Sequence, residues 1–311
     1  MRHTIHRRTF LKTAALTMSG LGFAAAGINA VEPFKRKGAP RLSLSLAAYS
    51  FRDFFATNAK GSAAKGSSSK QIDLFDFIDY CADQGCAGSE LTSYYFPKDA
   101  NTEYFIKLRR HAFLRGIEIS GSAVGNNFAV PKGAKRDAEI ASVKKWIANA
   151  AILGAPHVRI FAGNPQGISK DEAKQLCIEA IDECGEEAGK AGIFLGLENH
   201  GGIVAEPQDL LDIVKAVKSP WVGINLDTGN FHTDDPYKDL TSCAPYAVNV
   251  QVKAEIQKRG QKKELADLKR EMQILRDANY QGYVALEYES AEDPWTAVPR
   301  LLKELKALIE T

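Results

Sequence analysis

Strand-like and helix-like patterns of apolar residues alternate along most of the chain. The first strand signal covers residues 42–49, where apolar and polar positions alternate strictly. Seven more short apolar runs predict strands at residues 87–92, 118–124, 157–162, 195–198, 224–227, 248–251 and 284–287. Apolar residues spaced three and four apart predict helices at residues 72–84, 103–114, 136–153, 172–190, 207–217, 237–243, 265–278 and 295–309.

Eight strands that alternate with eight helices predict a single-domain (β/α)8 TIM barrel over residues 42–311. This length suits a barrel, which usually takes about 250 residues. The chain is 45% hydrophobic, enough for one large core. A doubly wound open sheet is the alternative, but no Gly-x-Gly-x-x-Gly turn follows the first strand, which disfavours it.

The last four apolar runs all end in an oxygen-bearing side chain. These residues are Glu198, Asp227, Gln251 and Glu287. The carboxyl ends of barrel strands meet on one face, so the four side chains should converge there. Three carboxylates and one amide oxygen suit a hard divalent cation such as Mn²⁺ or Mg²⁺ better than zinc. For Glu198 taken singly, an ion pair with Arg159 is the competing interpretation.

Lys253 lies two residues beyond Gln251 and should face the same way, because side chains alternate along a strand. In the barrel mouth its ammonium could polarise a substrate carbonyl or hold a hydroxyl, which makes it a candidate catalytic residue. The alternative is a structural salt bridge to Glu289 or Glu255. By the same alternation Glu289 shares a face with Glu287, as support for Lys253 or for the metal.

Further polar and aromatic residues follow the predicted strands and are candidates for substrate binding. They are Phe51, Arg52, Arg159, Asn230, His232 and Trp295. The aromatic rings could stack on a sugar, and the arginines could bind hydroxyl or anionic groups. Core packing for the rings, ion pairs for the arginines and a solvated surface position for His232 are the alternatives.

The first 30 residues form a separate segment. His6-Arg7-Arg8-Thr9-Phe10-Leu11-Lys12 precedes an apolar stretch rich in Ala and Gly, which is typical of a twin-arginine export signal. The stretch is short for a membrane span, so no stable membrane insertion is expected after the signal is removed. A linker over residues 31–41 would follow. We expect a periplasmic or otherwise exported protein; a plain N-terminal helix or a retained anchor is the alternative.

Charge and cysteine content limit the classes of partner. The formal net charge is +2 and the basic residues are dispersed, so nucleic acid is not an expected partner. The five cysteines have no paired C-x-x-C spacing, which favours buried thiols over a zinc site. A small sugar or glycoside is the expected ligand, while the oligomeric state is left open.

With these residues the chain resembles the xylose isomerase-like TIM barrel superfamily, in particular its sugar isomerase and epimerase branch. That family binds one divalent metal, commonly Mn²⁺, Mg²⁺ or Co²⁺, through Glu, Asp, His and Glu at successive strand ends. The acids match Glu198, Asp227 and Glu287 of this sequence. The family's His-x-Lys-Asp motif falls on residues 251–254, which read Gln-Val-Lys-Ala, so Gln251 replaces the histidine ligand.

The resemblance implies a metal-dependent isomerase or epimerase that moves a proton through an enediolate of a sugar or keto-sugar. Glu198 and Glu287 would exchange the proton on opposite faces, while His200 and Lys253 would orient the substrate oxygen. A metal-dependent lyase or hydrolase of 3-keto-glycosides and a non-catalytic exported sugar-binding protein are the alternatives. A DNA-repair endonuclease of the same superfamily would need a histidine-rich multi-zinc cluster, and few histidines are present.

Overall fold

The computed structural model describes residues 31–57 and 71–311, so the predicted export signal lies outside the described residues. Eight strands form a closed parallel barrel: β1 (Arg41–Ala47), β2 (Gly88–Thr92), β3 (Glu118–Ala123), β4 (His157–Ile160), β5 (Phe194–Glu198), β6 (Val222–Asp227), β7 (Ala247–Val252) and β10 (Gln281–Leu286). The helices are α2 (Leu74–Asp83), α3 (Thr102–Leu114), α4 (Ala134–Leu153), α5 (Lys170–Ala191), α6 (Pro207–Ala216), α7 (Pro236–Cys243), α8 (Leu268–Asp277) and α9 (Pro294–Ile309).

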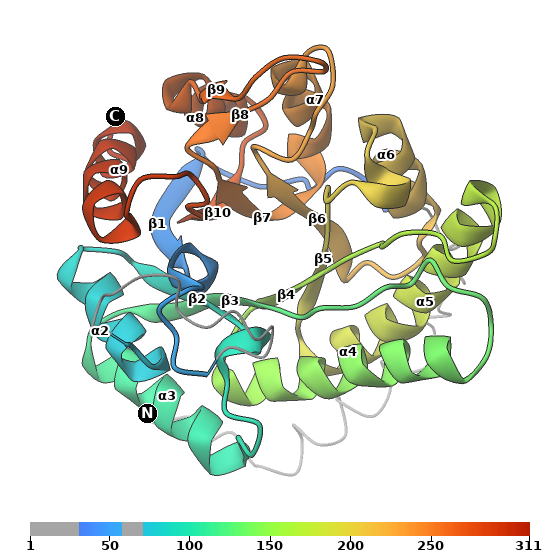
Figure 1. The fold of residues 1–311 in the computed structure, drawn as a ribbon, viewed down its shortest axis with the longest axis horizontal. Coiled ribbons are helices and arrows are strands. Elements are labelled where there is room, and N and C mark those ends of the chain that lie inside the picture. Colours follow the sequence, from blue (N-terminus) through green and yellow to red (C-terminus); the bar gives the residue numbers. More distant parts are fainter. Residues whose placement is uncertain (1–30, 58–70) are drawn as a thin grey trace, which may run out of the picture.

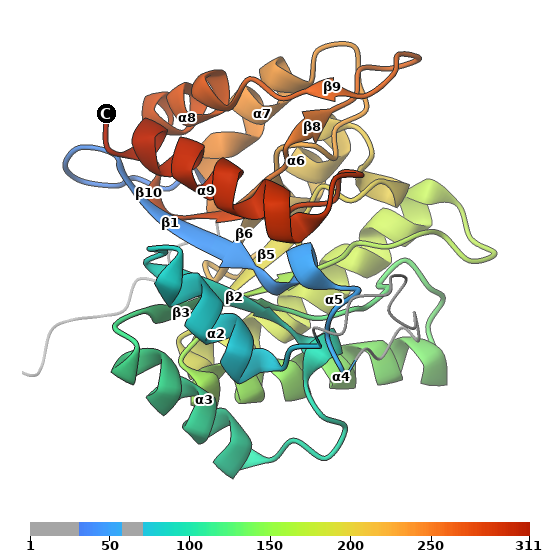
Figure 2. The same ribbon diagram turned by 60° about the vertical axis from the view of Figure 1, so that its left-hand side comes forward.

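Neighbouring barrel strands are also neighbours in the sequence, apart from the pair β1 and β10 that closes the ring. All the barrel pairings are parallel, and β1 pairs with β10 from Arg41 opposite Gln281 to Leu46 opposite Leu286. Figures 1 and 2 show the helices as an outer layer around the strands. The predicted (β/α)8 barrel is confirmed.

Helix boundaries follow from capping residues. Asp73 and Asp76 form a reciprocal capping box at the start of α2, with bonds of 2.8–3.0 Å to backbone N–H groups. Proline stands in the first turn of α6, α7 and α9, where no N–H group is needed. Gly154 ends α4 in the left-handed conformation, which a side chain would strain.

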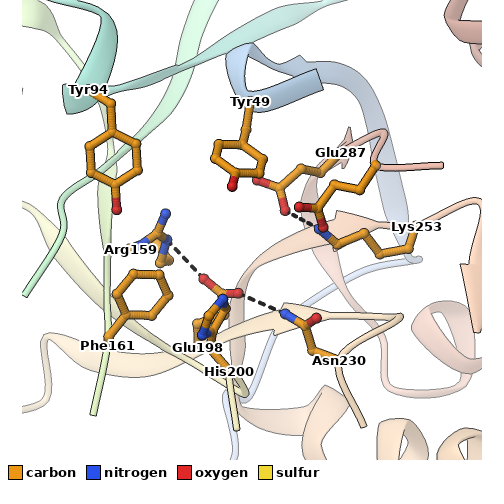
Figure 3. Close-up of a pocket in the computed structure, with 10 residues that line it drawn as sticks. Tyr49, Tyr94, Arg159, Phe161, Glu198, His200, Asn230, Lys253 and Glu287 are labelled. Carbon is orange, nitrogen blue, oxygen red and sulfur yellow. Dashed lines mark hydrogen bonds and ion pairs between the residues drawn. The ribbon is translucent and has the colours of Figure 1, made fainter. Parts of the chain in front are cut away.

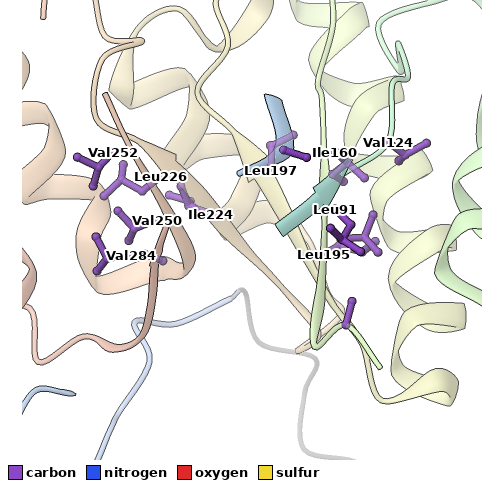
Figure 4. Close-up of a cluster of buried hydrophobic side chains, with 14 of the residues drawn as sticks. Leu91, Val124, Ile160, Leu195, Leu197, Ile224, Leu226, Val250, Val252 and Val284 are labelled. Atoms are coloured by element: carbon purple, nitrogen blue, oxygen red, sulfur yellow. The ribbon is translucent and has the colours of Figure 1, made fainter. Parts of the chain in front are cut away.

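The apolar side chains of the strands pack mainly outside the barrel, against the helices. In β5, Leu195 and Leu197 are fully buried and alternate with Gly196 and Glu198. Because successive strand residues face opposite sides, the leucines face the helices when Glu198 faces the interior. Figure 4 shows this apolar layer with its counterparts from β6, β7 and β10. The barrel interior is left to glycine and to hydrogen-bonded polar groups, such as Ser45 and Ser120, whose hydroxyl oxygens lie 2.6 Å apart.

The predicted linker packs against the base of the barrel. Phe34 makes an edge contact with Phe194 of β5, with ring centroids 5.8 Å apart. Arg36 donates from Nη2 to the carbonyl of Ala247, the first residue of β7, at 2.5 Å. The segment therefore covers the end of the barrel opposite to the predicted site.

Two short strands were not predicted from the sequence. β8 (Glu255–Ile256) and β9 (Glu264–Leu265) pair antiparallel directly after β7. Leu265, predicted to open a helix, belongs to β9, and α8 begins only at Leu268. All five cysteines are buried and free, as predicted. In the part of the chain that is described, no helix combines the length and apolar character needed to cross a membrane.

Candidate active site

A polar cavity lies at the carboxyl ends of the strands, with about 410 Å³ of space between its side chains that is partly open to solvent. Its side chains come from loops and strand ends around the ring (Figure 3). The lining residues are Tyr49, Tyr94, Arg159, Phe161, Glu198, His200, Asn230, Lys253, Glu287 and Glu289.

Glu198, the last residue of β5, is held from two sides. Nε of Arg159, in β4, lies 2.9 Å from Oε2 of Glu198, and Asn230 donates from Nδ2 to Oε1 at 2.9 Å. Arg159 also donates from Nη1 to the carbonyl of Val124 at 3.1 Å. The ion pair between Arg159 and Glu198, the alternative to a metal ligand in the sequence analysis, is therefore present, and it fixes the carboxylate in the cavity wall.

Lys253, the residue after β7, contacts three carboxylates. Its Nζ lies 3.2 Å from Oδ2 of Asp227 and 2.5 Å from Oε2 of Glu287, and it also pairs with Glu289. Only 9% of the Lys253 side chain is exposed, so these contacts are little weakened by solvent. Asp227 lies below the cavity surface, fully buried, and Oδ1 accepts a bond from the backbone N–H of Gly229 at 2.9 Å.

The buried carboxyl groups are harder to ionise than usual. Burial, together with the charges of Asp227 and Glu287, raises the pKa of Glu198 to about 8, although Arg159 opposes the shift. Burial likewise raises the pKa of Asp227 to about 7, against the effect of Lys253. The pKa of Glu287 is raised for the same reason. The cavity wall can therefore hold protons near neutral pH.

Lys253 and Glu289 keep their charges, because for each of them the neighbouring charges outweigh the effect of burial on the pKa. Burial alone would lower the pKa of Lys253, but the carboxylates around it raise that pKa well above the ordinary value, so its ammonium stays charged. Burial would raise the pKa of Glu289, but Lys253 lowers it, and Glu289 is ionised. Burial and the charge of Arg159 lower the pKa of His200, which leaves a neutral imidazole at pH 7.

The amide group of Gln251 does not point its oxygen towards the carboxylates, as the sequence analysis expected. Its Nε2 donates to Oε1 of Glu90 at 2.6 Å and approaches Oε1 of Glu287 at 3.4 Å. Its Oε1 accepts a bond from Nδ2 of Asn225 at 2.6 Å. The amide oxygen that was expected to bind a metal is thus used inside the barrel, and the amide NH₂ group faces the cavity carboxylate.

Three carboxylates and an amide are suitable ligands for a hard divalent cation, but their arrangement in the structure leaves no place for one. Among residues 31–57 and 71–311, no group of three or more His, Cys, Asp or Glu side chains is placed to hold a metal ion. Lys253 stands between Asp227 and Glu287, and Arg159 stands on Glu198. The residues therefore do not fit a bound cation in the geometry that the structure has.

Other predicted binding residues are placed around the cavity or outside it. His232 lines an adjoining cavity that shares Asn230, Lys253 and Glu289 with the first. Phe51 is buried and packs against Trp295 with centroids 4.5 Å apart, so both rings belong to an aromatic cluster. Arg52 lies over the ring of Tyr49 and donates to the carbonyl of Tyr288 at 3.1 Å.

Two site residues had not been singled out from the sequence. Phe161 lies under the guanidinium of Arg159, 3.9 Å from its Cζ, and its ring packs against His200. Because Phe161 directly follows β4, the strand-end rule could have found it. Glu90 lies inside β2 and is fully buried. Its position within a predicted strand was the sequence signal that could have identified it as a buried polar residue.

A family model described as xylose isomerase-like TIM barrel matches residues 78–306. No curated protein matches the sequence. Three solved structures illustrate the similarity of this chain to known folds. One is D-psicose 3-epimerase with D-tagatose from Clostridium cellulolyticum H10, at 16% identity and TM-score 0.66, covering 86% of this chain and 97% of that one.

The second is 3-keto-D-glucoside 4-epimerase from E. coli, at 14% identity and TM-score 0.63, covering 86% of this chain and 100% of that one. The third is the IolI protein with a bound zinc atom, at 18% identity and TM-score 0.63, covering 86% and 96%. At these identities the likeness to solved structures shows the fold. The family model spans most of the barrel, and the chain belongs to the xylose isomerase-like TIM barrel family.

Proposed function

We propose that this protein is a carbohydrate isomerase or epimerase that moves a proton at a carbon next to a carbonyl group. The proposal rests on one observation: two buried carboxyl groups, Glu198 and Glu287, line one cavity beside the ammonium of Lys253. They are held on β5 and just after β10, with β6 and β7 between them in the ring. A substrate carbon between them is within reach of two acid–base groups.

Glu198 in its ionised form takes the proton from the carbon next to the carbonyl. Its raised pKa makes it a stronger base than an exposed glutamate, and Arg159 and Asn230 hold it in place. Negative charge then develops on the carbonyl oxygen. The positive charge of Lys253 and the neutral imidazole of His200, both in the cavity wall, stabilise this charge. Burial raises the pKa of Glu287, so a fraction of this carboxyl group is protonated despite the contact with Lys253. That fraction returns a proton to carbon, which inverts the centre or moves the carbonyl.

A cleavage reaction on 3-keto-glycosides is the second candidate. The adjoining cavity shares Asn230, Lys253 and Glu289 with the main one and offers room for a second ring. The same carbanion could expel a leaving group from the next carbon. A non-catalytic sugar-binding protein would use the same cavity without proton transfer. A metal-assisted form of the reaction, with Mn²⁺, Mg²⁺ or Co²⁺ on Glu198, Asp227 and Glu287, requires Lys253 and Arg159 to leave these carboxylates.

The test is the entry of solvent deuterium into ketohexoses and 3-keto-glycosides, followed by NMR with and without added Mn²⁺. The wild type should exchange one C–H position of its substrate. Glu198→Gln and Glu287→Gln should each slow exchange by about 100-fold or more, since a lost acid–base group costs about 10²–10⁴ in rate. The exposed Glu292→Gln, outside the cavity, is the matched control. Wild-type exchange in both cavity variants would contradict the two-base assignment.

Product analysis separates the candidates. Epimers or isomers support the first, and release of the aglycone supports the second. Binding without any exchange, seen by calorimetry, supports the sugar-binding protein. For the export prediction, cell fractionation should find the mature protein in the periplasm, and a full-length cytosolic product would contradict it.

A further inference from the structure

The position expected for a metal ion holds a lysine. Nζ of Lys253 lies within 3.2 Å of Asp227 and 2.5 Å of Glu287 and is paired with Glu289. An ammonium group has three N–H donors, and here it has three carboxylate partners. It therefore uses the same oxygen atoms that a divalent ion would need, and it is covalently fixed to the end of β7.

Hydrogen bonds around Glu90 prevent Gln251 from acting as the fourth expected metal ligand. A carboxylate only accepts hydrogen bonds, so Glu90 requires NH₂ groups to face it. Asn249 donates from Nδ2 to Oε2 of Glu90 at 2.8 Å, and Gln251 donates to Oε1 at 2.6 Å. Asn225 in turn donates to the oxygen of Gln251 and accepts a bond from Asn249 at 2.8 Å. The three amides and Glu90 are thus mutually satisfied in one orientation.

This orientation presents nitrogen, not oxygen, to Glu287, which lines the cavity. Divalent ions such as Mg²⁺ and Mn²⁺ are bound through oxygen, and an amide NH₂ group is not a ligand for them. Turning the amide of Gln251 by half a rotation would bring its oxygen against Glu90 and would bring two NH₂ groups together at Asn225. Both contacts are unfavourable inside the barrel, where a polar group without a partner has lost its hydrogen bonds to water and gained none in return.

The remaining expected ligand, Glu198, already has two partners. Arg159 and Asn230 contact its two oxygens at 2.9 Å each. A metal ion would have to displace both and leave the buried guanidinium of Arg159 without its carboxylate. Loss of one partner from a buried ion pair is costly, because it leaves an uncompensated charge away from water.

We propose that the ammonium of Lys253 takes the place of the divalent cation in this site, and that Glu90 maintains this state by fixing the amide of Gln251 as a donor. This role of Lys253 rests on the proposed function, the transfer of a proton next to a carbonyl group. With Lys253 as the cation, that transfer needs no metal. The fixed positive charge of Lys253, whose N–H groups stay on the three carboxylates, stabilises by its field the negative charge that develops on the substrate oxygen. The site excludes divalent ions through its own cation.

The first test measures Mn²⁺ binding directly, by the loss of the free Mn²⁺ signal in electron paramagnetic resonance. Chelator-treated wild type should bind no Mn²⁺ at the site up to about 1 mM. Lys253→Met should bind one equivalent at least about 10-fold more tightly, because Asp227, Glu287 and Glu289 lose their cation. Lys258→Met, which breaks an ion pair with Glu264 outside the cavity, is the matched control and should not bind.

The outcome that overturns the proposal is stoichiometric Mn²⁺ binding by the wild type with a dissociation constant below about 1 mM. Failure of Lys253→Met to gain binding also overturns it. Circular dichroism and a thermal melt would confirm that the variant is folded. Lys253→Arg, which keeps the positive charge, should resemble the wild type and not bind Mn²⁺.

The role of Glu90 is tested by Glu90→Gln in the Lys253→Met background. The new amide can donate to Gln251, which frees Gln251 to turn its oxygen towards the cavity. The double variant should therefore bind Mn²⁺ more tightly than Lys253→Met alone. Equal affinity would show that Glu90 does not control the Gln251 amide.

Deuterium exchange in excess chelator separates this inference from the proposed function. Exchange that persists without metal supports both. Exchange that appears only with Mn²⁺ overturns the metal-free inference and leaves the isomerase or epimerase proposal standing. If no substrate exchanges under either condition, the proposed function fails, and Mn²⁺ binding alone decides whether Lys253 replaces the cation.

Discussion

Nε of Arg159 lies 2.9 Å from Oε2 of Glu198, and both side chains are buried at the ends of the adjacent strands β4 and β5. The guanidinium opposes the effect of burial on the pKa of Glu198. It also rests on the face of Phe161, which limits its movement. Arg159 therefore determines both the position of this carboxylate and the pH at which it ionises.

Arg159→Met should raise the pKa of Glu198 further above about 8, because the opposing charge is lost while burial remains. A base that ionises at higher pH is less available at pH 7, so kcat/KM for proton transfer should fall and its pH midpoint should move upward. The pH dependence of deuterium exchange measures this shift. Arg159→Lys keeps a positive charge and should lie between the variant and the wild type. An unchanged midpoint in Arg159→Met would contradict the assignment of Glu198 as the base.

Glu287→Gln should lower the pKa of Glu198. The negative charge of Glu287 contributes to the raised pKa of Glu198, so its removal should bring that pKa down from about 8. Carbon-13 NMR of the glutamate carboxyl groups follows the titration even if the variant is inactive. The exposed Glu292→Gln should leave the Glu198 titration where it is. A Glu198 midpoint that does not fall in Glu287→Gln would mean that the two carboxyl groups do not interact.

The sequence predicted those site residues that depend on local pattern. Alternation along a strand and the rule that barrel strands end on one face located Glu198, Asp227, Lys253 and Glu287. Both rules need only a few neighbouring residues and a parallel topology. The ion pairs of Lys253 with Glu289 and of Arg159 with Glu198, anticipated as alternatives, are present in the structure.

The orientation of Gln251 could not be predicted in this way. It depends on Glu90, which is 161 positions away and meets Gln251 only when the ring of strands closes. Phe51 and Trp295 illustrate a second limit. Both were candidates for stacking on a substrate, with core packing as the alternative. The direction of a side chain in the loop after a strand depends on packing, and the two rings pack against each other. The export signal stays a prediction.

Glu271 of α8 is a buried carboxyl group outside the cavity, and the side chain of Thr228 is its one polar contact among the described residues. Burial raises its pKa well above the usual value. The folded protein therefore holds this proton more tightly than the unfolded chain does. Stability from this group is present at low pH and is lost as pH rises from about 4.5 towards the folded pKa.

Glu271→Gln removes this pH-dependent loss. We expect the free energy of unfolding to rise by about 1–3 kcal/mol at pH 8 relative to the wild type, and by less at pH 5. Urea denaturation at the two pH values measures the difference. Asp277→Asn, an exposed acid on the same helix, should show no such pH-dependent gain. Equal effects of Glu271→Gln at both pH values would contradict a raised folded pKa.

Gly121 of β3 leaves space for His157 inside the barrel. A methyl group built at Gly121 would lie 1.9 Å from Cε1 and 2.4 Å from Nε2 of the imidazole, so the ring would have to move. That ring lies beside Glu90, with Nε2 3.8 Å from Oε2. Gly121→Ala should therefore destabilise the fold by about 1–3 kcal/mol, the usual cost of overpacking, measured by urea denaturation.

A double-mutant cycle with His157→Ala identifies the contact responsible for that loss. Removing the ring opens the space that the new methyl group needs, so the double variant should be more stable than the sum of the two single effects predicts. The coupling should be about 1 kcal/mol or more in favour of the pair. If the two effects simply add, the loss in Gly121→Ala comes from the backbone of β3 and not from the imidazole, and the close approach of Gly121 to His157 has no part in the stability of the barrel.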